Sequence, residues 1–473
     1  MRRLLALLIA LGAIATVLLT GAAPASSSST TFPFHARIGN IFGMVPTISE
    51  EHTAVSNSAP ASGSLDYNGG PVMPTSTVYT IFWQPSGYQF PAGYSANMNQ
   101  YFKDLQATAG KNTNTYVNGT QYYMQDGSTT TYVRNHTTYA GTTLDKDALP
   151  SLDPVNCPDT PVAATNGVGA TPSTTAGCVT DAQVQQEISA VIKQNKWPVN
   201  NTTEFFMFTA PNIGTCFPAQ ESEDEGGVTT TVTAPLCSFS YFCAYHSAYY
   251  DSTINSSSQV IYSNMPFAAQ TNGNPVTCDT GACPNNNASD PEISVTSHEH
   301  NESITDPFGT GWWDSNPNDS AYGEEDGDMC AWDFGNTYGA SGAEYNQTIN
   351  GHHYLMQLEW DNSTNGCPGS DASGNAVPSE PNYDTPSISL TPSQGYATAP
   401  FKIQGLFFAA GDSVASSFAD AGTTTTIPAT TANASGQISV LTRIPSKSKP
   451  GTATVTSKGS SGKATAALTV LAK

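Results

Sequence analysis

The composition of the chain excludes one broad class of function before any motif is considered. The chain has 473 residues, with 16 Lys and Arg against 38 Asp and Glu, which gives a formal net charge of −22. A general nucleic-acid-binding protein needs a basic face, so no nucleic acid is expected as a partner. Charged residues are only 11% of the chain and hydrophobic residues 38%, a balance that predicts a packed globular protein with many hydroxyl and amide groups on its surface.

The N-terminus has the residue order of a secretory signal. Arg2 and Arg3 precede an apolar run over 4–19, and small residues that end in Ala25 follow it. This order predicts a signal peptide over residues 1–25 and a secreted protein that is extracellular or associated with a cell wall. The run is shorter than the ~20 apolar residues that a membrane span needs, so we expect no stable membrane span after cleavage.

The next two segments differ in their periodicity. Residues 26–64 are rich in Ser, Thr, Ala and Pro without a sustained period, which predicts a flexible leader or pro-segment. Over 65–367, runs of β-branched and aromatic residues alternate with apolar residues at helical spacing. The predicted elements are, in chain order, a strand at 77–83, helices at 94–105 and 184–192, and strands at 203–209 and 259–263. This alternation favours an α+β or α/β main domain over 65–367.

The C-terminal part of the chain is predicted to be all-β. Residues 368–385 are rich in Pro, Ser, Gly, Asn and Asp, as in a linker. Over 386–473, short alternating runs predict strands at 387–390, 401–404, 437–440, 452–455 and 467–470. The pattern predicts a small β-sandwich that resembles the immunoglobulin-like modules of bacterial exported enzymes. A spacer or wall-proximal stalk is the favoured interpretation of this module over a specific ligand site.

Nine cysteines lie in the middle of the chain, and an exported protein normally oxidises its cysteines in pairs. Cys278 and Cys283 are close enough in sequence to close a small loop, and Cys330 and Cys367 bracket the last part of the main domain. The odd total leaves one thiol unassigned. Zinc ligation by cysteine is less favoured, because the sequence contains no CxxC pair.

The most informative segment is a helix predicted over 291–305. It begins with a proline, which suits the first helical turn, and it ends before a second Asp-Pro pair. His298 and Glu302 are four residues apart and so share one face of this helix. The pattern is that of the HExxH zinc helix with Glu in place of the second His, which predicts that both residues bind a metal. Glu299 is then the general base for a water whose pKa the metal lowers from 15.7 to about 7.

A third ligand is needed, and the acidic run at 324–328 offers candidates. Glu325 or Asp328 is expected to complete the site, and Asp306 is an alternative ligand or orients one. His300 points away from His298 on a helix and is expected at the surface or next to the ligands. The competing interpretation is a solvated acidic helix end without a metal. Zn²⁺ is the expected ion, while Ca²⁺ and Mn²⁺ remain open because most of these ligands are carboxylates.

Two other segments that contain histidine are interpreted structurally. The run Cys237 to Cys243, followed by His246, indicates a disulfide-rich loop rather than a ligand site. The pair His352-His353 is interpreted as part of a strand edge, although a proton-donor role is the alternative.

An ordered set of motifs carries a family resemblance. These are LDYNGGPVM at 65–73, VYTIFW at 78–83, SHEHNESITDP at 297–307, GDMC at 327–330 and GHHYLMQ at 351–357. The set resembles the EXORDIUM-like (phosphate-induced) protein family and its microbial relatives over most of 65–367. The resemblance implies an extracellular, wall-associated protein whose microbial branch looks like zinc metallopeptidases. It places the family's HExxE on His298, Glu299 and Glu302, and its ExGDxC on Glu325, Gly327, Asp328 and Cys330.

Three functional hypotheses follow from the sequence. The leading one is a secreted metal-dependent hydrolase, a zinc endopeptidase acting on a peptide or a cell-wall polymer through the HExxE helix. The second is an extracellular wall- or carbohydrate-binding protein in which the same residues hold a structural metal. The third is a glycosidase that uses Glu299 and a downstream carboxylate as acid and base.

Overall fold

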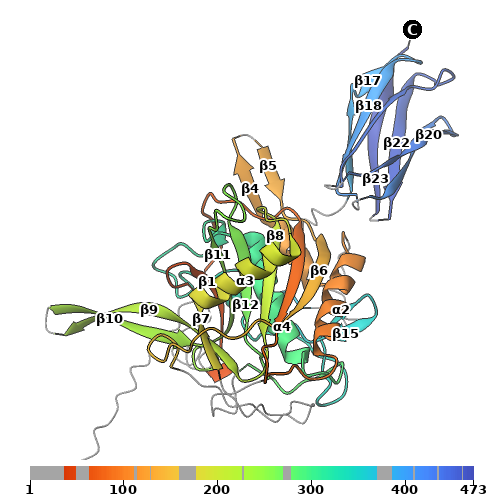
Figure 1. The fold of residues 1–473 in the computed structure, drawn as a ribbon. Coiled ribbons are helices and arrows are strands. Elements are labelled where there is room, and N and C mark those ends of the chain that lie inside the picture. The colour runs from red at the N-terminus through yellow and green to blue at the C-terminus, as the bar shows by residue number, and fades with distance from the viewer. Residues whose placement is uncertain are drawn as a thin grey trace, which may run out of the picture. The chain divides into compact units, whose positions relative to one another are not determined.

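The computed structural model describes most of the chain beyond the N-terminal segment (Figure 1). The described residues are 37–49, 63–110, 114–127, 129–158, 177–225, 228–269, 278–369, 386–408, 411–433, 436–460 and 462–472. The predicted signal peptide over 1–25 and nearly all of the predicted linker over 368–385 lie outside these residues.

A six-stranded mixed sheet forms the centre of the main domain. In spatial order its strands are β1 (Ile41–Pro46), β11 (Phe242–Tyr249), β12 (Val260–Met265), β8 (Thr203–Thr209), β3 (Ser76–Trp83) and β6 (Thr137–Asp145). The pairs from β12 to β6 are parallel, whereas β11 runs antiparallel to both β12 and β1. The strands predicted at 77–83, 203–209 and 259–263 are confirmed as β3, β8 and β12.

Two helices cover opposite faces of this sheet, and their side-chain contacts show it. Among the described residues, the main domain has the long helices α2 (Tyr94–Ala107), α3 (Asp181–Asn195) and α4 (Asp290–Thr305). In β12 the hydroxyl of Tyr262 donates to Asp181 of α3, while the next residue, Ser263, donates to Glu204. Glu204 also accepts from Ser303 of α4. Because successive strand residues point to opposite faces, α3 and α4 lie on the two sides of the sheet.

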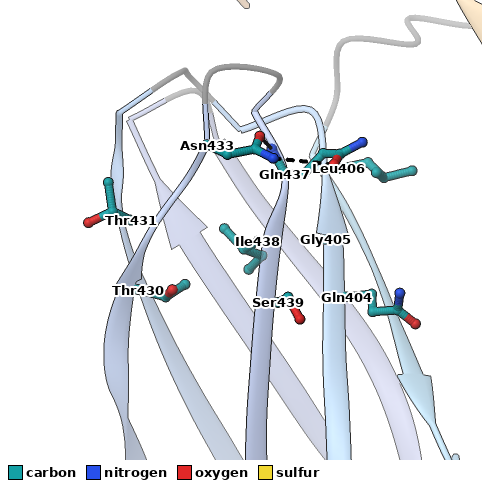
Figure 2. A pocket seen from close by; sticks show the side chains of 9 residues that line it. All are labelled: Gln404, Gly405, Leu406, Thr430, Thr431, Asn433, Gln437, Ile438 and Ser439. Atoms are coloured by element: carbon teal, nitrogen blue, oxygen red, sulfur yellow. Dashed lines mark hydrogen bonds between the residues drawn. The ribbon is translucent and has the colours of Figure 1, made fainter.

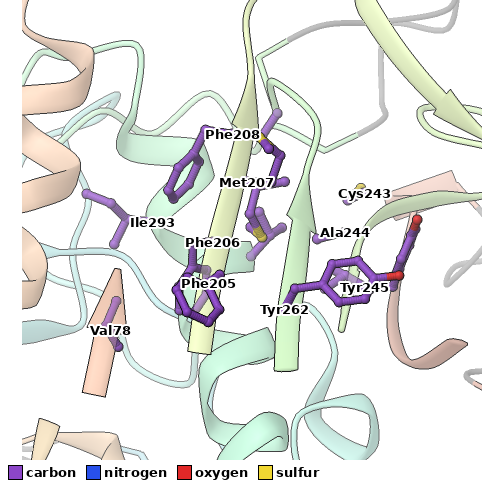
Figure 3. Close-up of a cluster of buried hydrophobic side chains, with 14 of the residues drawn as sticks. Val78, Phe205, Phe206, Met207, Phe208, Cys243, Ala244, Tyr245, Tyr262 and Ile293 are labelled. Carbon is purple, nitrogen blue, oxygen red and sulfur yellow. The ribbon is translucent and has the colours of Figure 1, made fainter. Parts of the chain in front are cut away.

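The core is built from strands that are apolar on both faces. In β8 the residues Phe205, Phe206, Met207 and Phe208 are all buried, and Figure 3 shows them among side chains of the neighbouring strands and Ile293 of α4. A continuous apolar run is expected for a strand with helices on both faces, which explains why 203–209 shows no alternation. The three predicted helices are confirmed. Together these elements establish an α+β fold.

The remaining elements of the main domain are short or peripheral. They are β2 (Asp66–Tyr67), η1 (Thr115–Gln121), β4 (Tyr123–Asp126), β5 (Thr129–Tyr132), β7 (Gly177–Thr180), β9 (Ile213–Glu225), β10 (Val228–Cys237), β13 (Trp312–Trp313), η2 (Asp328–Cys330), β14 (Gln347–Ile349) and β15 (His352–Tyr354). The predicted strand edge at His352-His353 is therefore part of a short hairpin, β14–β15.

Four disulfides are present, and one of them differs from the predicted pairing. They join Cys157 to Cys178, Cys216 to Cys237, Cys243 to Cys278, and Cys330 to Cys367. Cys278 does not close a loop with Cys283, which is the free cysteine of the described residues. The Cα atoms of Cys243 and Cys278 are 5.5 Å apart, which is an ordinary distance for a disulfide. This proximity could not be predicted from the sequence, because the two cysteines are 35 residues apart.

The number of disulfides indicates the kind of compartment in which the protein is found. Four bridges fit an extracellular protein, since disulfides persist in oxidising environments. None of the helices among the described residues is long and apolar enough to cross a membrane.

The C-terminal part folds as two β-sheets with their own apolar cores. One sheet has the order β16 (Ser387–Thr391), β18 (Pro400–Leu406) and β21 (Ile438–Arg443). The other has the order β17 (Gln394–Gly395), β23 (Gly462–Val470), β22 (Gly451–Gly459), β19 (Ser413–Asp420) and β20 (Thr423–Thr431). Phe401, Phe418 and Leu468 are buried in one of these cores. All five predicted strands are confirmed, and β17, β19 and β20 are three further strands that the sequence analysis did not predict.

The predicted flexible leader is wrong where the structure describes it. Within 26–64, residues 41–46 form β1, and all six are buried in the central sheet. Its apolar residues Ile41, Phe42, Met44 and Val45 do not alternate with polar ones, because the strand is covered on both faces. No period was therefore visible in the sequence.

Candidate metal centre

The HExxE segment lies on a helix that is buried along its whole length. Every residue of α4 is buried, and His298, Glu299 and Glu302 have 0% of their surface exposed. Buried ionisable side chains are rare unless they are paired or bind a metal. The competing interpretation of a solvated acidic helix end is therefore wrong.

One group of donor atoms forms between α4 and the start of η2. Nε2 of His298 lies 2.9 Å from Oε1 of Glu302 and 3.4 Å from Oδ1 of Asp328. The main-chain N–H of Asp328 donates to Oε1 of Glu302 (2.9 Å), which fixes η2 against the helix. Donor atoms bound to one tetrahedral zinc at about 2.1 Å are separated by about 3.4 Å. The spacing of these three residues is thus close to that of a metal ligand set.

A second group shares Glu302 and brings in a histidine that the sequence analysis assigned to a structural loop. Nδ1 of His246, on β11, lies 3.4 Å from Oε2 of Glu299 and 3.7 Å from Oε2 of Glu302. Nε2 of His246 donates to the main-chain oxygen of Asp306 (3.2 Å). Burial lowers the pKa of His246 to about 3, so the ring is neutral and Nδ1 carries a lone pair. Three acceptors therefore converge here, an arrangement that needs a cation or a shared proton.

The site has more buried polar atoms than the described protein groups satisfy. Atoms without a hydrogen-bond partner among the described residues are His246 Nδ1, both ring nitrogens of His298, both carboxylate oxygens of Glu299, Glu302 Oε2, Glu325 Oε2 and Asp328 Oδ1. An unsatisfied buried polar atom costs roughly 1–3 kcal/mol, and more when it is charged. Burial raises the pKa values of Glu299 and Glu302 well above the ordinary range of a glutamate, and neighbouring carboxylates raise both values further. A divalent cation would satisfy these atoms and offset their charge.

Glu325 and Asp306 lie outside the group formed by His298, Glu302 and Asp328. Both accept from the guanidinium of Arg37, with distances of 2.9 Å to Glu325 and 2.7 Å to Asp306. Asp306 also accepts from the main-chain N–H groups of Thr310 and Gly311. The structure therefore brings Asp328, not Glu325, into the group with His298 and Glu302, and leaves Asp306 to orient His246 through its main-chain oxygen.

His300 is buried and lies away from both groups. Its Nδ1 is 2.9 Å from the hydroxyl of Tyr116, and its Nε2 is 2.9 Å from Oγ of Ser76. Burial lowers the pKa of His300 to about 3, so this ring is neutral. The expected direction away from His298 is confirmed, but the surface position is wrong, because η1 and β3 cover this face of α4.

Two further buried acids accept hydrogen bonds from α4: Asp326 belongs to the acidic run at 324–328, whereas Glu359 was not identified from the sequence. Glu359 accepts from Nδ2 of Asn301 (2.9 Å), and Asp326 accepts from the hydroxyl of Thr305 (3.0 Å). Glu359 follows the GHHYLMQ motif by two residues, and no spacing rule connects it to α4. Glu359 lies close to α4 only because the chain folds back onto this helix.

The described part of the chain also contains a pocket in its C-terminal β region. Figure 2 shows it between the ends of β18, β20 and β21. Its nine lining residues are Gln404, Gly405, Leu406, Thr430, Thr431, Asn433, Gln437, Ile438 and Ser439. None of these nine is acidic, basic or a strong metal ligand, so this pocket does not compete with the α4 cluster as a site for hydrolysis.

Comparisons with known proteins add little to the geometry. No protein-family model matches the chain, and a search of characterised protein sequences found no match. Among solved structures, macromomycin is similar to a segment that covers 18% of this chain and 98% of macromomycin, at 18% identity and a TM-score of 0.15. A similarity this weak carries no argument about function.

Proposed function

We propose that the protein is a secreted, metal-dependent hydrolase, a zinc endopeptidase related to the EXORDIUM-like family. The observation that carries the proposal is the convergence, around Glu302 on a fully buried helix, of histidine and carboxylate atoms that have no hydrogen-bond partner among the described residues. Buried charges of this kind are retained where they serve a site, because apolar residues would otherwise be more stable there. The four disulfides support the extracellular part of the proposal.

In this proposal His298, Glu302 and Asp328 hold the zinc ion. Bound there, zinc would polarise a substrate carbonyl and lower the pKa of a coordinated water. Glu299 is the general base, because it adjoins the ligand set but does not belong to the group that contains His298. Its Oε2 lies 3.4 Å from Nδ1 of His246, beside a neutral imidazole. In its carboxylate form Glu299 would accept a proton from water and return it to the leaving amine.

A second function is favoured by one observation, the complete burial of the site. His298, Glu299 and Glu302 are 0% exposed, as expected for a structural metal in a wall- or carbohydrate-binding protein. In that case the ion would stabilise the fold and no substrate would be turned over.

The test is elemental analysis of the purified full-length protein, followed by a peptidase assay. We expect about one zinc per chain, lost when His298→Ala is combined with Glu302→Ala. His353→Ala, which changes an exposed histidine on β15, is the matched control and should keep the metal. Glu299→Gln should keep the metal and lose turnover. Absence of metal from the wild-type protein overturns the proposal, and metal without turnover supports the structural alternative. Turnover of a glycan that survives chelation would instead indicate the glycosidase.

A further inference from the structure

The strand next to the metal site comes from the N-terminal segment of the chain. β1 is the edge strand of the central sheet and pairs antiparallel with β11, the strand that carries His246. Phe42 pairs with His246 and Val45 with Ala244, and the register shifts between these two pairs. β1 also contacts α4 and η2. The irregular part of the strand, Gly43-Met44, therefore lies at the site.

The main chain at Gly43 touches the donor atoms directly. A Cβ atom placed on Gly43 would overlap Oε2 of Glu302 and lie 2.7 Å from Nδ1 of His246. Gly43 has φ +48°, a conformation that residues with a side chain rarely adopt. Glycine is thus required here both by its conformation and by the space left between the strand and Glu302.

Polar contacts hold the segment 37–49, here called the N-terminal strap, at both ends. Arg37 binds Asp306 and Glu325, and its guanidinium also lies over the ring of Trp313. At the other end, Nε1 of Trp332 donates to the main-chain oxygen of Pro46 (2.9 Å). The first cysteine of the chain is at position 157, so no disulfide ties the strap to the rest of the protein.

We propose that the β11 edge is the binding site for an extended polypeptide substrate, and that the N-terminal strap occupies it and keeps the enzyme inactive until the strap is displaced. The inference rests on the proposed peptidase function and deepens it. An edge strand without a partner exposes main-chain donors and acceptors that pair with any extended peptide. A peptide in the place of β1, with a glycine at the position of Gly43, brings its main chain next to Glu302 and His246. Occupancy by the strap accounts for the complete burial of the site.

The test separates strand binding from turnover. A recognition sequence for a specific protease is inserted between residues 55 and 56, and the full-length protein is cut there after purification. A fluorescent peptide with the sequence of residues 37–49 is then titrated into cut protein that carries Glu299→Gln, which binds but does not turn over. The matched control is the same peptide with Gly43→Val. We expect the first peptide to bind and the Val peptide to bind at least tenfold more weakly, because its Cβ overlaps Glu302.

Turnover is measured on cut and uncut wild-type protein with unfolded casein. We expect at least a tenfold increase on cutting and inhibition by added 37–49 peptide but not by the Val peptide. Equal binding of the two peptides would overturn the inference. Loss of folded structure in the cut protein, measured by circular dichroism, would also overturn it, because β1 would then be a structural strand. Selective binding without any turnover would leave the binding edge intact and overturn the peptidase function instead.

Discussion

Nε2 of His298 lies 2.9 Å from Oε1 of Glu302, the residue one helical turn further along α4. Both side chains are fully buried, and the second carboxylate oxygen of Glu302 faces His246 at 3.7 Å. One carboxylate thus connects an imidazole from its own helix with an imidazole from a strand of the sheet. A site with this arrangement depends on Glu302 more than on any single flanking acid.

Glu302→Gln should therefore remove the metal, whereas Glu325→Gln should only weaken metal binding, by about 10–100-fold. The amide keeps the volume of Glu302 but removes the charge and one acceptor, while Glu325 acts on the site through Arg37 and His246. Elemental analysis and competition with a fluorescent zinc chelator measure both effects. Equal metal loss in the two variants would contradict the ligand set proposed here.

Glu299→Gln should lower peptide hydrolysis by about 10²–10⁴-fold at unchanged metal content, the usual contribution of a general base. Gln has nearly the same shape as Glu, but its amide does not accept a proton from water. Activity is compared at matched zinc loading on protein cut between residues 55 and 56. An active Glu299→Gln enzyme would remove Glu299 from the mechanism.

Glu292→Gln should flatten the pH dependence of stability. Burial raises the pKa of Glu292 from 4.5 to about 8, although the N–H of Ala268 donates to it and opposes the shift. The folded protein therefore holds this proton more tightly than the unfolded chain between pH 4.5 and 8, and the free energy of unfolding falls as the pH rises through that window. Above about pH 8 the fall levels off.

Thermal unfolding from pH 4 to 9 measures this dependence. The Tm of the Gln variant should rise relative to the wild type as the pH approaches 8, with little difference near pH 4. Glu204, whose pKa burial also raises to about 8, should leave a residual slope in the variant. Parallel curves for the two proteins would show that Glu292 does not titrate in this way.

Removal of the Cys243–Cys278 bridge should destabilise the protein, whereas removal of the free thiol should not. Cys278→Ser opens a bridge between residues 35 apart, for which loop-closure entropy predicts a loss of about 3–4 kcal/mol. Cys283→Ser changes a cysteine that is unpaired in the structure and should alter the unfolding free energy by less than about 1 kcal/mol. Denaturant unfolding and disulfide mapping check both expectations. A large effect of Cys283→Ser would support the Cys278–Cys283 loop instead.

Elements with local signals were predictable from the amino-acid sequence. The helix over 291–305 was predicted from a proline in its first turn and a second Asp-Pro pair beyond its end, and the structure has it at Asp290–Thr305. The strands at 77–83 and 203–209 followed from β-branched and aromatic composition. Spacing along one helix also placed His298 and Glu302 on a common face. Each of these inferences needs only contacts between residues a few positions apart.

The distant residues that join this face of α4 could be identified only from the packing of the folded chain. His246 was assigned to a disulfide-rich loop, yet strand alternation directs Tyr245 towards Asp181 of α3 and the next side chain, His246, towards α4. β1 was assigned to a flexible leader, because a strand buried on both faces has no alternation to detect. The pairing of β1 with β11 and the approach of Gly43 to Glu302 join residues that are more than 190 positions apart in the chain. Such contacts leave no periodic signal in the sequence, since the free energy that fixes them arises only when the sheet and α4 pack together.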